Sequence, residues 1–188
     1  MGGHLPVVDL GGLDVVQLAL GFWHSCALLA GATVKCFGRG FVLGLGDTRW
    51  QNRGDNPGEM GSELPALDLG TDFEPVELTA GAYHTCALSR RGTVKCWGYA
   101  YLLGLGWSAA AGYIGSRPNE MGDSLPTLDL GALPAVQISA GVVHTCAVLV
   151  DGSARCWGES DLGQLGHGTT EPGHGAGKEG IDASELIE

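Results

Sequence analysis

Hydrophobic and polar residues alternate in three short runs of the chain: VVQLAL at 15–20, PVELTA at 75–80 and AVQISA at 135–140. In the first run, Val16, Leu18 and Leu20 fall on one side, and Gln17 and Ala19 fall on the other. A period of two residues is typical of a β-strand with two different faces. The pattern therefore predicts three equivalent strands.

A glycine follows each run, and after it comes a segment that predicts a β-hairpin with one cysteine in each arm. The three segments are LGFWHSCALLAGATVKCFG at 20–38, AGAYHTCALSRRGTVKCWG at 80–98 and AGVVHTCAVLVDGSARCWG at 140–158. Their first cysteines are 60 residues apart, and so are their second cysteines. A fixed period of this kind indicates a repeat architecture.

The turn of the third hairpin fixes its register. VDG at 150–152 suits a three-residue connection, a type I turn followed by a left-handed glycine, with Leu149 and Ser153 as the flanking hydrogen-bonded pair. Counting back places Cys146 opposite Cys156 in a non-hydrogen-bonded pair, with Cα atoms ~4.5 Å apart. A disulfide accepts that separation.

The same count joins Cys86 to Cys96, and it joins Cys26 to Cys36 although the turn glycine is shifted by one residue there. Of about 15 possible pairings of six cysteines, only this one respects the repeat, and each bond would contribute ~2–3 kcal/mol. Six reduced core cysteines are the alternative. A zinc site is disfavoured because the two cysteines of a hairpin are too far apart in sequence for common structural sites.

Each unit begins with Met-Gly, Leu-Pro and Asp-Leu-Gly, and it ends in a glycine-rich segment and a long polar loop. We expect three repeats, at 1–59, 60–120 and 121–167, and a flexible C-terminal tail at 168–188. GIDASELIE at the end of the tail could form a turn or two of helix. A phosphate loop is not expected in GHGAGKE at 173–179, since Pro172 and Glu179 depart from that motif.

Composition narrows the function classes. The chain has 188 residues, 44% hydrophobic and 16% charged, with 33 glycines and a formal net charge of −11. This balance fits a soluble globular protein, and it argues against nucleic acid, whose binding needs a basic face. No apolar stretch is long enough to predict membrane insertion, and no motif calls for a cofactor.

The residues AGAYHTCAL, GTVKCWG and LGQLGHG resemble the repeat of the regulator of chromosome condensation family, and more closely its Cys-containing, tubulin-suppressor-like branch. The resemblance implies an all-β fold of four-stranded β-propeller blades, usually about seven to a ring, with protein-binding surfaces on ring faces and loops. It does not fix one function, because members include a guanine-nucleotide exchange factor, a photoreceptor and scaffold domains.

Three such blades would form an incomplete ring or arc, whereas closed propellers have about 4–8 blades. An open arc leaves sheet edges and inner faces uncovered, which invites pairing. The chain could be a fragment of a longer propeller, a ring-forming subunit or a wedge in a larger assembly. We therefore expect a protein partner or self-association.

Three sets of repeated residues are candidates for chemistry, and each has a structural interpretation. The histidines could ring a ligand or metal, but a polar anchor within each blade is expected. The aromatic residues are expected in the core rather than on a carbohydrate platform. The aspartates are expected to cap turns. The sets are His24, His84 and His144; Phe37, Trp97 and Trp157; and Asp9, Asp68 and Asp129.

Two long loops, 47–59 and 107–120, differ strongly between repeats and are the expected binding surface. Their candidate partner-binding residues are Trp50, Arg53, Asp55, Trp107, Tyr113 and Arg117. Arg53-Gly54-Asp55 is an adhesion tripeptide, but its glycine and aspartate also suit an ordinary turn.

No nucleophile stands with a base, and no metal-ligand spacing occurs, so an enzyme is not expected. The favoured function is a non-catalytic protein-interaction or scaffold module. A structural subunit of a large complex in an oxidising compartment is one alternative, and an exchange-factor-like regulator is the other. The cysteines favour an extracytoplasmic location, such as secretion, the cell surface or an organelle lumen.

Overall fold

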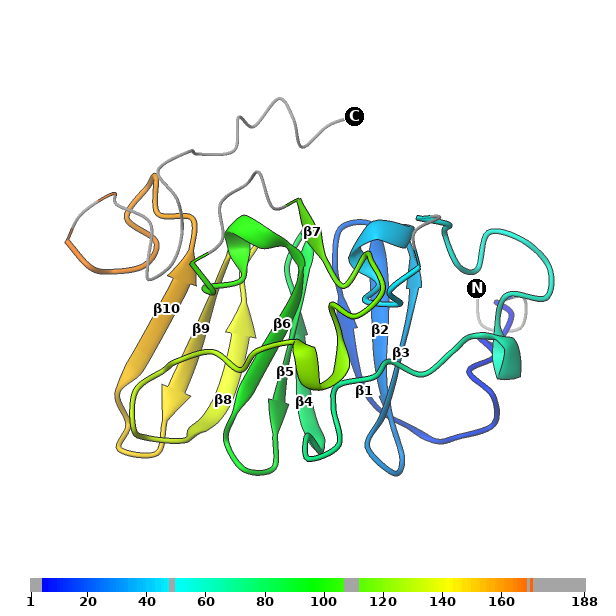
Figure 1. Cartoon of the computed structure of the whole chain (residues 1–188), viewed down its shortest axis with the longest axis horizontal. Coiled ribbons are helices and arrows are strands. Elements are labelled where there is room, and N and C mark those ends of the chain that lie inside the picture. The colour runs from blue at the N-terminus through cyan, green and yellow to red at the C-terminus, as the bar shows by residue number, and fades with distance from the viewer. Residues whose placement is uncertain (1–4, 48–49, 107–111, 169, 171–188) are drawn as a thin grey trace.

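The structure is a computed structural model that describes residues 5–47, 50–106, 112–168 and 170. The described residues form three antiparallel sheets that stand side by side (Figure 1). We call them blades 1, 2 and 3. Blade 1 contains β1 (Val15–Leu20), β2 (His24–Leu29) and β3 (Thr33–Gly38). Blade 2 contains β4 (Pro75–Ala80), β5 (His84–Ser89), β6 (Val94–Tyr99) and β7 (Tyr113–Ile114), and blade 3 contains β8 (Ala135–Ala140), β9 (His144–Leu149) and β10 (Ala154–Gly158).

This arrangement confirms the predicted all-β fold of three blades in an incomplete ring. Short 3-10 helices lie in the connecting segments: η2 (Gly40–Val42), η3 (Gly61–Glu63), η4 (Ala100–Leu102) and η6 (Gly122–Ser124). The alternating runs are the first strands of the three blades, as their period of two predicts.

A fourth strand is present only in blade 2 among the described residues, so the expectation of four strands per blade needs correction. In blade 1, the equivalent pairing is a single bridge between Gly38 and Arg53. The next backbone group in blade 1, Gly40 N, donates to the side chain of Asn52, whereas Ala100 N in blade 2 donates to the backbone of Gly112. A side chain thus replaces the main chain there, and the ladder does not extend.

The hairpins have the register predicted from the third turn. Cys146 lies opposite Cys156, and Leu149 N donates to Ser153 O. All six cysteines are paired within their own hairpins, with Cα atoms 4.1, 4.1 and 4.0 Å apart in blades 1, 2 and 3. Each disulfide therefore ties the second strand of a blade to the third.

The largest core cluster lies between the blades. One face of each hairpin carries the cysteines, and in blade 1 it packs with the first strand of blade 2, whose Leu78 is buried in the same core cluster as Cys26 and Leu28. We call this side of a blade its trailing face, and the opposite side, which carries Leu78 in blade 2, its leading face. Each junction between blades therefore joins a trailing face to a leading face.

Candidate interaction surface

One histidine at each junction reaches from its own blade to the next. His24 Nε2 lies 2.7 Å from Thr85 Oγ1, and His84 Nε2 lies 2.7 Å from Thr145 Oγ1. The prediction of a structural anchor holds, but its location was wrong, because the anchor joins two blades instead of staying within one. The reason is geometric: each histidine lies on the trailing face, and each threonine lies on the leading face of the following blade.

Burial depresses the pKa of both anchoring histidines. The pKa of His24 falls to about 4 because burial disfavours the charged imidazolium. The pKa of His84 falls to about 3, first through burial and then through the charges of His24 and His144. Both imidazoles are neutral at pH 7, which suits a hydrogen-bonding role.

A second set of contacts ties the first strands of neighbouring blades together. Leu78 N donates to Gln17 Oε1 at 2.8 Å, and Gln17 Nε2 donates back to Leu78 O at 3.0 Å. At the next junction, Ala140 N donates to Thr79 Oγ1 at 2.8 Å. Polar residues of the alternating runs therefore satisfy backbone groups that a free sheet edge would expose.

Blades 1 and 2 each contain a buried lysine that donates hydrogen bonds to a connecting segment. Lys95 Nζ donates to the carbonyls of Leu69 and Gly122, each at 2.8 Å, and Lys35 Nζ donates to Gly61 O at 2.8 Å. Burial lowers the pKa of Lys95, while Asp123 and Asp68 oppose that shift. Sequence reasoning missed this role, although the repeated basic position in the third strand was a visible signal.

The other repeated residues serve as the sequence predicts in most cases. The backbone N–H groups of Gly11, Gly70 and Gly131 donate to Asp9, Asp68 and Asp129 Oδ1, respectively. Trp97 and Trp157 are buried in the core. Phe37 is only half-buried, because no preceding blade covers it among the described residues.

The described parts of the two loops share more structure than the sequence suggested. In the first, Gly54 N and Asn56 N both donate to Glu59 Oε2, at 2.9 and 3.1 Å. In the second, Gly115 N and Arg117 N both donate to Glu120 Oε2, at 3.0 Å each. Although the two loops differ strongly in sequence, GDNPGEMG and GSRPNEMG within them form the same carboxylate-capped turn.

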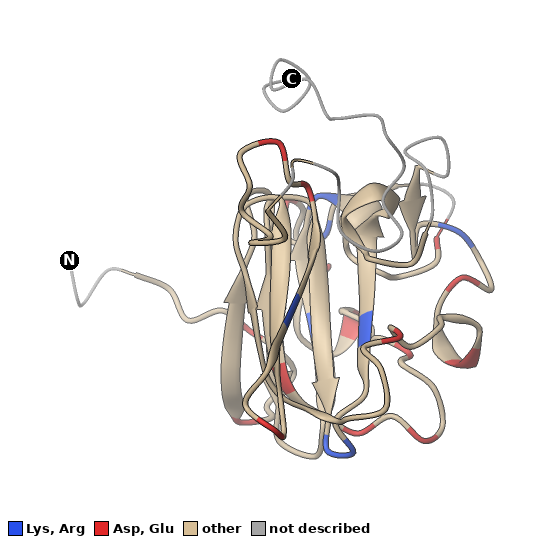
Figure 2. Ribbon diagram, turned by 90° about the vertical axis from the view of Figure 1, so that its left-hand side faces the viewer, with Lys and Arg blue, Asp and Glu red and all other residues tan. Residues whose placement is uncertain are grey.

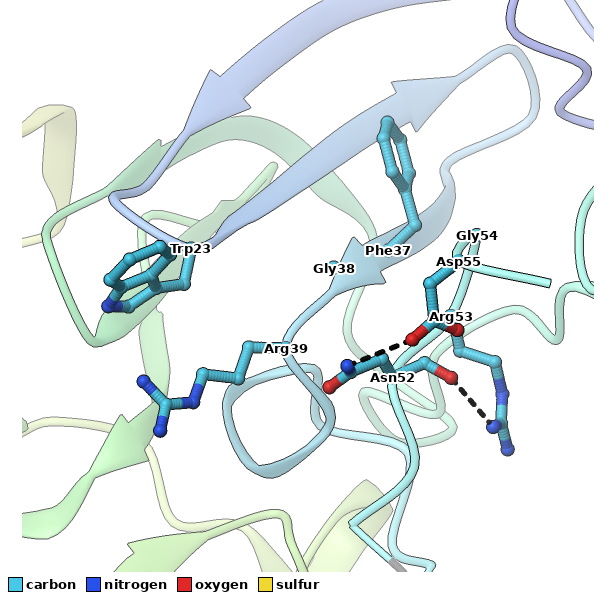
Figure 3. A pocket seen from close by; sticks show the side chains of 8 residues that line it. All are labelled: Trp23, Phe37, Gly38, Arg39, Asn52, Arg53, Gly54 and Asp55. Carbon is cyan, nitrogen blue, oxygen red and sulfur yellow. Dashed lines mark hydrogen bonds between the residues drawn. The ribbon is translucent and has the colours of Figure 1, made fainter. Parts of the chain in front are cut away.

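The part of the first loop that does differ exposes an aromatic side chain. Trp50 is 54% exposed and has a left-handed backbone, φ 49°. Residues 52–55 of the same loop line a cavity of about 530 Å³ (Figure 3), with Trp23 and Arg39 on one side and Asp55 on the other. The Arg39 guanidinium lies 4.5 Å from the Phe41 ring and 5.7 Å from the Trp23 ring. Aromatic and cationic groups therefore gather at this end of blade 1.

The adhesion tripeptide is built into the blade. The main chain of Arg53 is paired with Gly38, and its side chain binds Asp47 at 2.6 Å. Asp55 Oδ2 accepts from Asn52 Nδ2 at 3.0 Å. The structure thus uses these residues to hold the turn, in line with the ordinary-turn interpretation.

The second loop contributes less exposed surface in its described part. Tyr113 is half-buried in β7, with its ring 4.3 Å from Phe41 and 5.3 Å from Tyr99. Arg117 is exposed and pairs with Glu120 at 3.7 Å. Trp107 lies outside the described residues, as do GHGAGKE and the predicted terminal helix.

Neither a metal centre nor a membrane span is found in the part of the chain that the structure describes. It contains no group of three or more His, Cys, Asp or Glu side chains suited to a metal ion. None of its helices is long and apolar enough to cross a bilayer. Acidic positions are spread over the loops at both ends of the sheets (Figure 2).

The sequence signature of the regulator of chromosome condensation (RCC1) repeat matches three segments of the chain, residues 15–42, 76–100 and 135–164. The segments contain the first three strands of blades 1, 2 and 3, respectively, except that the second segment starts one residue after Pro75. The chain is an RCC1-repeat protein. The two inter-blade anchors, His24 and His84, lie in its first and second repeats, and His144 is the equivalent residue of the third.

Several known proteins resemble this RCC1-repeat chain. The Arabidopsis thaliana ultraviolet-B receptor UVR8 is 34% identical over 160 residues, which cover 84% of this chain and 32% of the receptor. The crystal structure of human WBSCR16 matches with a TM-score of 0.63 and 20% identity, over 89% of this chain and 41% of that one. Yeast RCC1 (Prp20), solved with Kap60, matches with a TM-score of 0.62 and 20% identity, over 87% and 36% of the two chains.

These relatives establish the fold and leave the function open. The chain spans about a third of the length of UVR8, and less than half of the two solved structures. At 20% identity, the structural likeness shows a shared propeller architecture alone.

Proposed function

We propose that this RCC1-repeat protein is a non-catalytic protein-interaction module whose first loop, residues 50–59, contacts the partner. The observation that carries the proposal is the exposed indole of Trp50 on a loop whose turn, at Gly54 and Asn56, donates two backbone hydrogen bonds to Glu59. Trp and Arg are the residues most often found at the energetic centre of protein interfaces. A loop that is already ordered loses little conformational entropy on binding.

The surroundings of Trp50 suggest the chemistry of the partner. The net charge of −11 favours a basic or polar protein surface over nucleic acid. Arg39 and Trp23 line the adjacent cavity, so an aromatic or carboxylate side chain of the partner fits there. Both features point to a protein surface of mixed character.

Two variants, one that truncates a tryptophan and one that truncates a valine, test this function when they are compared with the wild type. Affinity purification from the source cells should give at least one protein at fixed stoichiometry with the wild type. Trp50→Ala should lose that protein, whereas Val150→Ala, which truncates an exposed apolar residue at a hairpin tip, should keep it. If no bound protein depends on Trp50, the proposal fails. Stimulated release of labelled GDP from small GTPases would instead indicate an exchange-factor function.

One observation favours a second candidate, a structural subunit of a larger assembly. Large apolar residues are exposed on the first strand of blade 1, among them Leu18 and Leu20, and exposed apolar surface of this kind often marks an interface. Co-purification in a large particle at fixed stoichiometry, unaffected by Trp50→Ala, would support this function over the first.

The three hairpin disulfides support an oxidising compartment and the Cys-containing, tubulin-suppressor-like branch of the family. Mass spectrometry of peptides digested without reductant should find each hairpin cross-linked in the protein isolated from its source. Six free thiols in that protein would contradict the compartment and this branch assignment.

A further inference from the structure

The two ends of the blade array expose the two halves of one junction. On the leading face of blade 1, Leu18 is 55% exposed, while its counterparts Leu78 and Ile138 are 2% and 3% exposed. A preceding blade covers Leu78 and Ile138, whereas no blade precedes blade 1 among the described residues. Leu18 is therefore an apolar contact residue without its covering blade in the described chain.

The trailing face of blade 3 shows the opposite half. Ala154 is exposed, whereas its counterparts Val34 and Val94 are 1% and 0% exposed. The disulfide of blade 3 is half-buried, whereas those of blades 1 and 2 are fully buried. The surface that the first two blades bury against a neighbour is thus open in the third.

Polar groups at the two ends match as well. His144 occupies the position from which His24 and His84 reach the next blade. Ser25 occupies the position of Thr85 and Thr145, and it supplies the same hydroxyl group. Because Ser25 lies on the leading face of blade 1, a blade 1 placed against a blade 3 would bring this hydroxyl to the imidazole of His144.

We propose that two copies of the 188-residue chain associate head to tail, the leading face of blade 1 in each copy packing on the trailing face of blade 3 in the other. Two such junctions close a ring of six blades, a number within the range of about 4–8 found in closed propellers. A contact between different faces gives a ring when its rotation closes.

A second copy fits these faces because the chain already builds the same junction twice. Blades 1 and 2, and blades 2 and 3, join through a buried Leu or Ile, a disulfide-bearing face and a His–Thr hydrogen bond. The ends carry Leu18, the open disulfide face and the His144–Ser25 pair in the same places. This inference concerns the end faces, and it stands or falls separately from the loop proposed to bind a partner.

Mixing two end-blocked variants tests the arrangement. Leu18→Glu places a carboxylate on the leading end, and Ala154→Glu places one on the trailing end; both positions are exposed, so each chain should still fold. Val76→Glu is the control, because Val76 and its counterparts Val16 and Val136 are exposed in all three blades. Circular dichroism would check the fold, and sedimentation equilibrium would give the mass.

The wild type and Val76→Glu should sediment as two chains of 19.4 kDa each. Each end-blocked variant alone should be a monomer, with dimerisation weakened by about 100-fold or more, because it must bury an unpaired carboxylate. An equimolar mixture should regain a dimer through its one unblocked junction.

Three outcomes would overturn the proposal. A wild-type chain that stays monomeric at about 100 μM, a concentration at which a micromolar dissociation constant would give mostly dimer, would mean that further blades or another protein cover the ends. A wild-type dimer that survives both blocking substitutions would mean pairing through other surfaces. A dimer sensitive to only one of the substitutions, or a series of open polymers, would exclude a closed two-copy ring.

Discussion

His84 Nε2 lies 2.7 Å from Thr145 Oγ1, so a buried side-chain hydrogen bond joins the hairpins of blades 2 and 3. The Nδ1 atoms of His24 and His84 are buried and have no hydrogen-bond partner in the described residues. At such a position, a ring nitrogen without hydrogen costs less free energy than an N–H group without an acceptor. This favours the tautomer with hydrogen on Nε2. The histidine then donates, and the threonine hydroxyl is free to point elsewhere, as Thr85 does toward Cys26 Sγ at 3.8 Å.

Removing this hydroxyl should destabilise the blade array. Thr145→Val keeps the shape of the side chain but leaves the buried Nε2 of His84 without an acceptor, at a cost of about 1–3 kcal/mol. Urea denaturation would measure the loss. Thr127→Val is the matched control, since Thr127 is exposed, and it should change the stability by less than about 0.5 kcal/mol. Equal effects of the two substitutions would show that the anchor contributes nothing.

Stability should fall as the pH drops below 6.5. His24 and His84 have pKa values of about 4 and about 3 in the folded protein, below the ordinary 6.5. The unfolded chain therefore binds more protons than the folded one between these pKa values. The contribution of the two histidines to the free energy of unfolding is complete only above pH 6.5. For His24, the loss in the free energy of unfolding increases as the pH falls to about 4, where it amounts to about 3 kcal/mol.

Denaturation at pH 7.5, 6.0 and 5.0 would measure this slope, above the range in which most carboxylates titrate. His84→Gln removes one titrating group while keeping a side chain that can bond Thr145. Its stability should depend less on pH than that of the wild type across this window. An unchanged slope would show that His84 is not buried in its neutral form.

Much of the fold was predictable because the repeat shows the same pattern three times. The period of two in the first strands and the turn VDG fixed the strands and the cysteine register, both of which depend only on local geometry. The junction between blades could not be predicted in the same way. Nothing local to His84 shows that its partner is Thr145, 61 residues away, because that contact depends on how neighbouring blades are rotated.

The candidate site was predictable only in part. Trp50 could be located as a residue that breaks the repeat, and it is exposed. The cavity that residues 52–55 of the same loop line also includes Trp23 and Arg39, which come from a different part of the blade and are brought there only by the folded hairpin. The carboxylate-capped turn was visible in the shared glycine, proline and glutamate of the two loops, but their remaining differences concealed it.

The first hairpin turn should gain stability from a glycine. Ala32 has φ 60°, and it occupies the left-handed position held by Gly92 and Gly152 in the other two turns. A left-handed conformation costs a non-glycine residue about 1–2 kcal/mol, partly offset by the greater unfolded-state entropy of glycine. Ala32→Gly should therefore stabilise the protein by about 0.5–1 kcal/mol in thermal or urea unfolding.

The reverse substitution separates strain from packing. Gly152→Ala meets open space and should cost only the backbone strain, whereas a Cβ at Gly92 would lie 2.4 Å from Pro134 Cβ and 2.9 Å from Ala135 O. Gly92→Ala should therefore destabilise the protein more than Gly152→Ala does. If Ala32→Gly lowers the stability, or the two alanine variants are equal, the turn geometry described here is wrong.

Replacing the buried lysine of blade 2 should loosen its connecting segments. Lys95→Met keeps the length of the side chain but leaves the carbonyls of Leu69 and Gly122 without their donor, at an expected cost of about 2–3 kcal/mol. Arg155→Met is the matched control, since Arg155 occupies the same position in blade 3 and is exposed. Both substitutions are best measured in the Ala154→Glu background, which blocks the proposed pairing of two copies. If Arg155→Met costs as much as Lys95→Met there, the hydrogen bonds of Lys95 do not explain why this position is basic in all three blades.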